Sequence, residues 1–142
     1  MQRRFDWASP SSRLVLSAAL DALSEVGYEG LTLTEVRARA GAAGALVEEG
    51  DLVEVVATAL EEVRVFPLPA PSGDLRADLA ALLRPWTARR GRAERAVAAV
   101  LSAAEWEPRI KRAVVQAPRC QVDLDELVDH LVAGLGVERR TA

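Results

Sequence analysis

The stretch of residues 31–41 most constrains the fold of this 142-residue chain. Thr32 stands three residues before Glu35, so the Thr32 hydroxyl can accept a hydrogen bond from the Glu35 amide and begin a short helix. The glycine that closes the stretch ends that helix. Val36 and Ala40 lie one turn apart on one face, and the small residues around them let a second helix approach closely. This spacing is typical of a helix-turn-helix.

The residues before and within this stretch form a longer pattern. They are Arg13, Leu16, Ala18, Ala19, Leu20, Glu25, Gly27, Tyr28, Leu31, Thr32, Val36, Ala38, Ala40 and Gly41. The series closely resembles the N-terminal domain of the TetR family of transcriptional regulators, in which a first helix ending in Gly-Tyr packs over a helix-turn-helix. The resemblance implies an all-α fold with three short N-terminal helices, a connecting helix and a small helical C-terminal domain for ligand binding and dimerisation.

The chain departs from the family pattern after Gly41. Family members continue with a Val-Ser start to the DNA-reading helix, then Thr-Leu-Tyr, an aromatic residue one turn later, and a Lys at the head of the next helix. Here residues 42–52 read AAGALVEEGDL, which is several residues shorter and lacks the Ser, Tyr, aromatic residue and Lys. Descent from a DNA-binding regulator and present DNA binding are therefore separate questions.

Apolar residues at helical spacing predict helices along the rest of the chain. The buried stripe of the first helix is expected to be Leu16, Ala19, Leu20, Leu23 and Val26. We expect Ser11 or Ser12 to cap this helix, Asp51 to cap the connecting helix, and Asp74 to cap the helix that Pro85 then kinks or ends. A further helix is expected over 92–104. The predicted organisation is a helix-turn-helix domain at 1–50, a connecting helix at 51–65, a Pro-rich linker at 66–73 and a C-terminal helical domain at 74–142.

Charge and cysteine content limit the classes of function. Residues 1–65 carry six basic and eleven acidic side chains, a net charge of −5, which matches the DNA polyanion poorly. Cys120 is the one cysteine of the sequence and can form neither an internal disulfide nor a metal-ligand cluster. Without a triad at usable spacing or a Gly-rich phosphate loop, we expect no enzyme, no cofactor and no metal. No charge-free stretch approaches the roughly 20 residues that cross a bilayer, which predicts a cytoplasmic protein without membrane contact.

The DNA-reading segment has few groups that could contact DNA. The DNA-binding residues predicted from the resemblance and from their position are Arg37, Arg39, Ala42, Ala43 and Gly44. The arginines would contact phosphates, but the alanines and the glycine carry no side-chain donor or acceptor for base edges. Glu48 and Glu49 would meet the phosphates with like charge. The alternative is a relic turn that packs Leu46 and Val47 inward.

The resemblance also implies a ligand site among the C-terminal helices. Family members bind small, mostly apolar inducers there, and such pockets combine aromatic side chains with a few polar groups. The candidate lining residues are Trp86, Trp106, Cys120 and His130. Core packing is the plainer interpretation of the tryptophans. A run of arginines flanking Trp86 could hold an anion, or it could be a solvated loop; its members are Arg84, Arg89, Arg90, Arg92 and Arg95.

The last predicted helix indicates how the chain assembles. Its apolar stripe is Leu124, Leu127, Val128, Leu131 and Leu135. A body this small can hardly cover that stripe alone, so two copies are expected to pair through it as a homodimer. The function implied by the resemblance is transcription regulation, in which a small ligand is coupled to operator binding. The alternative is a TetR-derived protein that no longer binds DNA specifically and acts through dimerisation or a protein partner.

Overall fold

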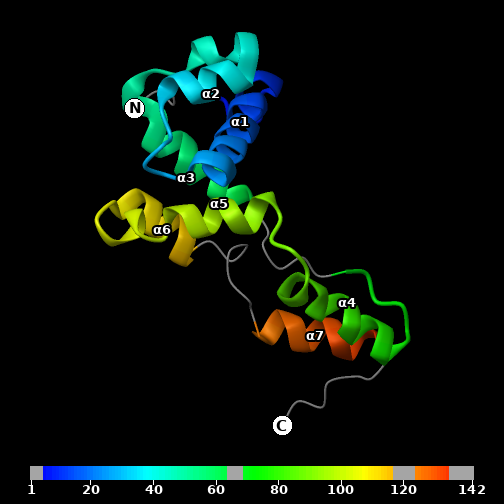
Figure 1. Cartoon of the computed structure of the whole chain (residues 1–142). Coiled ribbons are helices and arrows are strands. Elements are labelled where there is room, and N and C mark those ends of the chain that lie inside the picture. Colours follow the sequence, from blue (N-terminus) through cyan, green and yellow to red (C-terminus); the bar gives the residue numbers. More distant parts are fainter. Residues whose placement is uncertain (1–4, 64–68, 117–123, 135–142) are drawn as a thin grey trace.

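The computed structural model describes residues 5–63, 69–116 and 124–134, and within these ranges it contains helices and no strand (Figure 1). The α-helices are α1 (Pro10–Val26), α2 (Leu33–Ala40), α3 (Leu52–Glu62), α4 (Leu75–Thr87), α5 (Arg92–Val100), α6 (Pro108–Gln116) and α7 (Leu124–Gly134). Three short 3-10 helices lie between them: η1 (Gly41–Leu46), η2 (Glu49–Asp51) and η3 (Ala103–Glu105). The expected all-α fold class is therefore confirmed. No helix in these ranges is long and apolar enough to cross a membrane.

Helix α1 begins one turn earlier than its sequence indicates. Its cap is Ser9, whose hydroxyl accepts a hydrogen bond from the Ser12 amide at 3.2 Å, and Pro10 occupies the first turn. The expectation that Ser11 or Ser12 caps the helix is wrong, because Pro10 has no amide hydrogen and is well suited to the first helical position. The predicted stripe is buried except for Val26 at the exposed last turn. Gly27 then ends the helix at a φ of 74°, which a residue with a side chain adopts rarely.

Helix α2 begins and ends as its sequence predicts. The Thr32 hydroxyl accepts the Glu35 amide at 3.2 Å, and Gly41 comes after the helix with a φ of 60°. Val36 and Ala40 are both buried on the side that packs against α1. The chain continues into the 3-10 helix η1 and then turns through η2 into α3.

Asp51 plays a different part from the one expected. Its carboxylate accepts the Glu48 amide at 2.8 Å and so closes η2 in a capping box, and it makes no side-chain cap for α3. Asp51 therefore stands at the N-cap position of α3 as predicted, but its side chain caps η2 and not α3. The cause is the shortness of the connection: the tight turn of η2 leads straight into Leu52, so Asp51 already has helical backbone angles.

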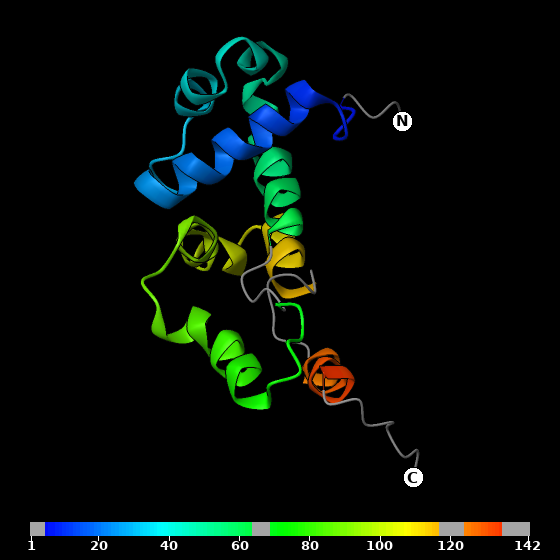
Figure 2. The ribbon, with the colours of Figure 1, turned by 90° about the vertical axis from the view of Figure 1, so that its right-hand side faces the viewer.

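One hydrophobic core joins the helices before and after the predicted linker. Helix α1 packs against α2 and α3 on one side and against α5 on another, and α3 packs against α6 (Figures 1 and 2). From the C-terminal half, the core takes in Ala96, Val100, Ala103, Ile110, Ala113 and Val114. The helix expected over 92–104 is interrupted, because α5 ends at Val100 and η3 comes next. Residues 64–68, which include the start of the predicted linker, lie outside the described ranges.

An arginine clamp fixes α6 on α3. The Arg109 guanidinium donates to both carboxylate oxygens of Glu54, at 2.8 and 3.0 Å, and also to Glu61. Glu54 and Glu61 lie two turns apart on one face of α3, so a single planar guanidinium can span them. The Arg109 hydrogen bonds lower the pKa of Glu54, and those two carboxylates raise the pKa of Arg109.

Helices α4 and α7 lie side by side as a pair, below the other helices in Figure 1. Asp74 caps α4 as predicted, because its carboxylate accepts the Arg76 and Ala77 amides at 3.0 and 3.3 Å. The helix continues past Pro85 and ends at Thr87. Leu75, Leu79 and Leu83, spaced four residues apart, remain exposed on α4.

The arginine clamp predicts a pH dependence of stability. Glu54→Gln removes a carboxylate. In the folded protein the pKa of this carboxylate lies below its ordinary value of 4.5. The wild-type carboxylate therefore stabilises the fold above that pH, and the contribution disappears as the pH falls and Glu54 becomes protonated. We expect the variant to lose less than about 1 kcal/mol at pH 7, because the Glu54 side chain is 49% exposed. Urea unfolding from pH 7 to pH 3 measures the difference, which should shrink below about pH 4.5.

The matched control is Glu29→Gln, at an exposed carboxylate that makes no ion pair with the described residues. Its difference from wild type should stay flat over the same pH range. A Glu54→Gln difference that is equally flat would contradict the role of the clamp.

Candidate functional site

The segment after α2 occupies the place where a DNA-reading helix is expected. It is the 3-10 helix η1, six residues long, and its sequence is GAAGAL. A 3-10 helix is tighter than an α-helix and is rarely longer than a few residues. Ala42 and Ala45 are exposed on it, whereas Ala43 and Gly44 are buried and face the protein. Of the three predicted base-side positions, Ala42 alone is accessible.

The buried position of Gly44 results from its closeness to α2. A Cβ atom placed on Gly44 would lie 2.7 Å from the Arg37 Cα and 3.0 Å from the Arg37 carbonyl oxygen. Real Cβ atoms do not approach backbone atoms so closely, so only glycine allows this contact between η1 and α2. The 3-10 helix η1 therefore packs directly on α2 and does not project away from it.

Arg37 holds the other end of the same connection. Its Nη2 atom donates to the Val47 carbonyl oxygen at 2.6 Å, and Val47 itself is fully buried. Of the two residues in the relic-turn alternative, Val47 packs inward as expected, but Leu46 is 44% exposed. The bond turns Arg37 toward the protein backbone, where its guanidinium closes a loop.

Arg39 is occupied by carboxylates. Its Nη2 atom lies 2.8 Å from a Glu25 oxygen at the end of α1 and 3.4 Å from a Glu35 oxygen one turn back on α2. The Glu25 hydrogen bond, and after it the Glu35 bond, raise the pKa of Arg39. Both arginines predicted to contact phosphates therefore already have partners on the chain. Glu48 and Glu49 lie exposed just beyond them.

Of the four predicted ligand residues, the structure describes the side chains of Trp106 and His130, which lie on different elements. Trp106 comes directly after η3 and is 66% exposed. Its ring lies edge-on to the ring of Tyr28, with 5.8 Å between the two ring centroids. His130 lies on α7, where its Nε2 atom is buried and makes no hydrogen bond to the described residues. The side chain of Trp86, and Cys120 altogether, lie outside the described part.

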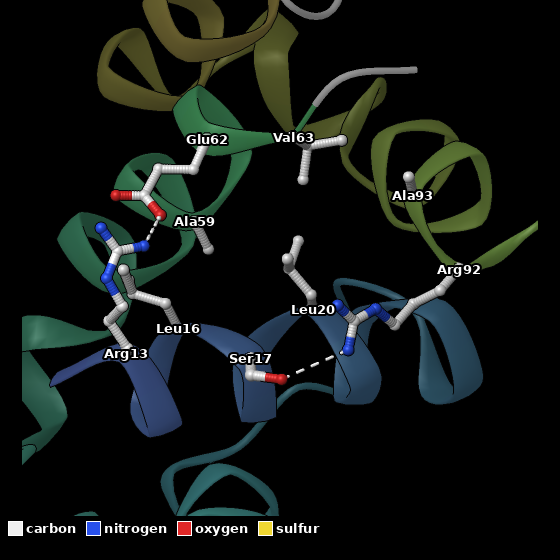
Figure 3. A pocket seen from close by; sticks show the side chains of 9 residues that line it. All are labelled: Arg13, Leu16, Ser17, Leu20, Ala59, Glu62, Val63, Arg92 and Ala93. Atoms are coloured by element: carbon white, nitrogen blue, oxygen red, sulfur yellow. Dashed lines mark hydrogen bonds and ion pairs between the residues drawn. The ribbon is translucent and has the colours of Figure 1, made fainter. Parts of the chain in front are cut away.

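A pocket of about 370 Å³ lies elsewhere, between α1, α3 and α5 (Figure 3). Its residues are Arg13, Leu16, Ser17, Leu20, Ala59, Glu62, Val63, Arg92 and Ala93. The pocket was not predicted from the sequence, because its members come from three helices and most of them belong to stripes that are typical of core. The only signal was Arg92, which stood out as a member of the arginine run.

The predicted dimer residues are distributed unevenly. On α7, Leu127 and Leu131 are partly buried, while Val128 is exposed. The side chain of Leu124 and the whole of Leu135 fall outside the described residues. Of the two helices α4 and α7, α4 has the larger exposed apolar stripe in the described residues, formed by Leu75, Leu79 and Leu83. This stripe is not the one that was expected to form the dimer.

Comparisons with known proteins add no assignment. No protein-family model matches the chain, and neither a curated protein nor a solved structure does so. Within the described residues, no three His, Cys, Asp or Glu side chains lie close enough to hold a metal ion.

The contact between η1 and α2 predicts that Gly44 cannot be replaced. We expect Gly44→Ala to lower the free energy of unfolding by about 1–3 kcal/mol, because its Cβ atom meets the Arg37 backbone, which has little room to move. Gly50→Ala is the matched control, since a Cβ atom there meets nothing within 4 Å. Chemical unfolding of both variants measures the effect. Equal stability of the two would show that η1 does not pack on α2 as described.

Proposed function

We propose that this chain is a TetR-like dimeric protein that has lost sequence-specific DNA reading and acts through dimerisation or a protein partner. The observation that carries the proposal is the connection between α2 and α3, where the reading helix is replaced by η1. Two local features support descent from the family: Gly27 and Tyr28 directly follow α1, and Thr32 then caps α2.

The chemistry of η1 argues against base readout. Reading a base edge needs side-chain donors and acceptors, or apolar groups that reach a thymine methyl, carried on an element that enters the major groove. The exposed side chains of η1 are two alanine methyls and Leu46. A six-residue segment packed against α2 is also too short to lie along the major groove of DNA.

The electrostatics around η1 argue against binding to the phosphate backbone. Binding to duplex DNA is driven largely by cations that displace condensed counterions. Here Arg37 is bonded to a backbone carbonyl and Arg39 to two carboxylates. A phosphate bound by Arg39 would have to displace its two carboxylates, and the excess of acidic side chains over residues 1–65 would remain around Arg37 as well.

The pair of α4 and α7 supports assembly of two copies. Two helices alone enclose no core, and the usual solution is to pair with two more as a four-helix bundle. Leu75, Leu79 and Leu83 form an uncharged stripe on α4, and Val128 is exposed on α7. A second copy supplies the same stripe, so the contact can be symmetric.

The first test is DNA binding by the full chain. We expect binding to duplex DNA no tighter than the micromolar range near physiological salt, the range of non-specific contacts. Fluorescence anisotropy with a labelled duplex, repeated over a salt series, measures it. Submicromolar affinity with a steep salt slope would overturn the proposal and favour a regulator that binds an operator.

A graft provides the positive control for that test. Replacing residues 42–51 with a full-length segment that carries the family's Ser, Tyr, aromatic residue and Lys removes Glu48 and Glu49 and restores phosphate contacts. DNA binding should become tighter, with about one added unit of salt slope for each new phosphate contact. A folded graft that binds no better than the parent would locate the defect outside the reading segment.

The second test is the oligomeric state. Leu83 on α4 and Leu14 on α1 are both 58% exposed, so a charge costs a similar desolvation at either site in the monomer. Leu83→Glu should shift the protein from dimer to monomer, because its carboxylate would be buried in the bundle. Leu14→Glu should leave the dimer unchanged. Sedimentation equilibrium over a range of concentrations distinguishes them, and a wild-type monomer at high concentration would reject the dimer.

A further inference from the structure

The pocket between α1, α3 and α5 has an apolar floor and a charged rim. Leu16 and Leu20 of α1, Ala59 and Val63 near α3, and Ala93 of α5 supply the floor. On one side of the rim Arg13 is paired with Glu62 at 3.1 Å, and on the other Arg92 donates to Ser17 at 3.3 Å (Figure 3). Its volume of about 370 Å³ lies within the range of small-molecule sites, roughly 300–1,000 Å³.

Arg92 has donors left to offer. In the described part of the chain its bonds go to Ser17 and, at 2.8 Å, to Asp21, and both come from Nη1. A guanidinium carries five N–H donors, so those on Nε and Nη2 can serve another acceptor. Its side chain is 46% exposed and reaches from α5 across the pocket mouth to α1.

The arginine clamp shows that one guanidinium of this protein can hold two carboxylates. Arg109 uses Nε and Nη2 for Glu54 and Nη1 for Glu61. Arg92 uses Nη1 for Asp21, which leaves free the Nε and Nη2 edge that Arg109 gives to Glu54. A carboxylate at that edge of Arg92 would therefore complete a geometry already present elsewhere in the molecule.

We propose that this pocket binds a small carboxylic acid with an unbranched aliphatic chain. The carboxylate accepts hydrogen bonds from Arg92 at the rim, and the chain lies over Leu16, Leu20 and Val63. Arg13 is paired with Glu62 and Arg92 with Asp21, so what favours an anion is the set of donors that Arg92 keeps on Nε and Nη2. A ligand with an amine group would need the Glu62 carboxylate, which already accepts a hydrogen bond from Arg13. The rim therefore favours a carboxylate over an amine.

The site is distinct from the surfaces of the proposed function. It lies away from η1 and from the pair of α4 and α7, and its lining residues belong to neither. A ligand there contacts three helices at once, so binding should raise the melting temperature of the folded protein. The inference consequently stands or falls separately from DNA binding and from dimerisation.

The test is calorimetric titration of the full chain with octanoate. We expect a single site with a dissociation constant on the order of 100 µM, in line with the binding energy available to a ligand of this size. The alcohol 1-octanol keeps the chain and removes the charge, and it should bind about tenfold more weakly or worse. Equal affinity for the alcohol would overturn the carboxylate assignment, and no heat at millimolar octanoate would overturn the site.

Two pairs of variants locate the binding. Arg92→Gln should weaken octanoate about tenfold or more, because a charged hydrogen bond is lost, whereas Arg95→Gln, on the same helix but outside the lining, should not. Ala93→Leu should abolish binding by filling the pocket, whereas Ala98→Leu, at an exposed position of α5, should leave it intact. Circular dichroism checks that each variant is folded. Octanoate binding that survives both Arg92→Gln and Ala93→Leu would place the ligand elsewhere and reject the proposal.

Discussion

The burial of α1 on two sides is the constraint on which the other helices depend. Its alanines Ala18, Ala19 and Ala22 are almost fully buried, and the small side chains let neighbouring helices approach closely on either side. Helices α2 and α3 use one side and α5 uses another. Because α5 packs on α1 directly, the described core continues from α1, α2 and α3 into α5 and α6, and the pocket lies between α1, α3 and α5.

The short connection between α2 and α3 is the second constraint, and it leaves few side chains exposed that could contact DNA. With few residues between α2 and α3, the chain keeps close to α2, and it does so with a glycine at the tight approach, a buried valine and a bond from Arg37. Each of these contacts improves the packing of the turn. Each also removes a group that a reading helix would present to DNA. In this sequence the contacts that stabilise the short turn are thus the same contacts that would keep its side chains out of a DNA groove.

Local signals were the part of the fold that the sequence could predict. The Thr32 and Asp74 caps, the glycines that end α1 and α2, and the buried stripe of α1 depend on residues a few positions apart. The cap of α1 was assigned to Ser11 or Ser12 in place of Ser9, and the side chain of Asp51 to α3 in place of η2, because the choice of cap depends on where the preceding turn ends. The ion pair between Arg39 and Glu25 and the pocket lining could not be predicted, since they join residues on different helices. The exposure of Leu79 on α4 is likewise set by distant residues: periodicity shows that an apolar stripe exists, but the neighbouring helices decide whether it is covered.

The arginines show the same limit for function. Arg37 bonds a carbonyl, Arg39 and Arg109 each hold two carboxylates, and Arg92 holds one carboxylate beside an apolar pocket. In the sequence these four residues are equivalent cations, and the two nearest the helix-turn-helix are the natural candidates for phosphate contacts. In the fold, a guanidinium can serve a ligand only with the donors that its neighbours leave free. By that measure Arg39 and Arg109 have little left to offer, whereas Arg92 keeps its Nε and Nη2 donors beside an apolar pocket, although it lies outside the motif that suggested DNA binding.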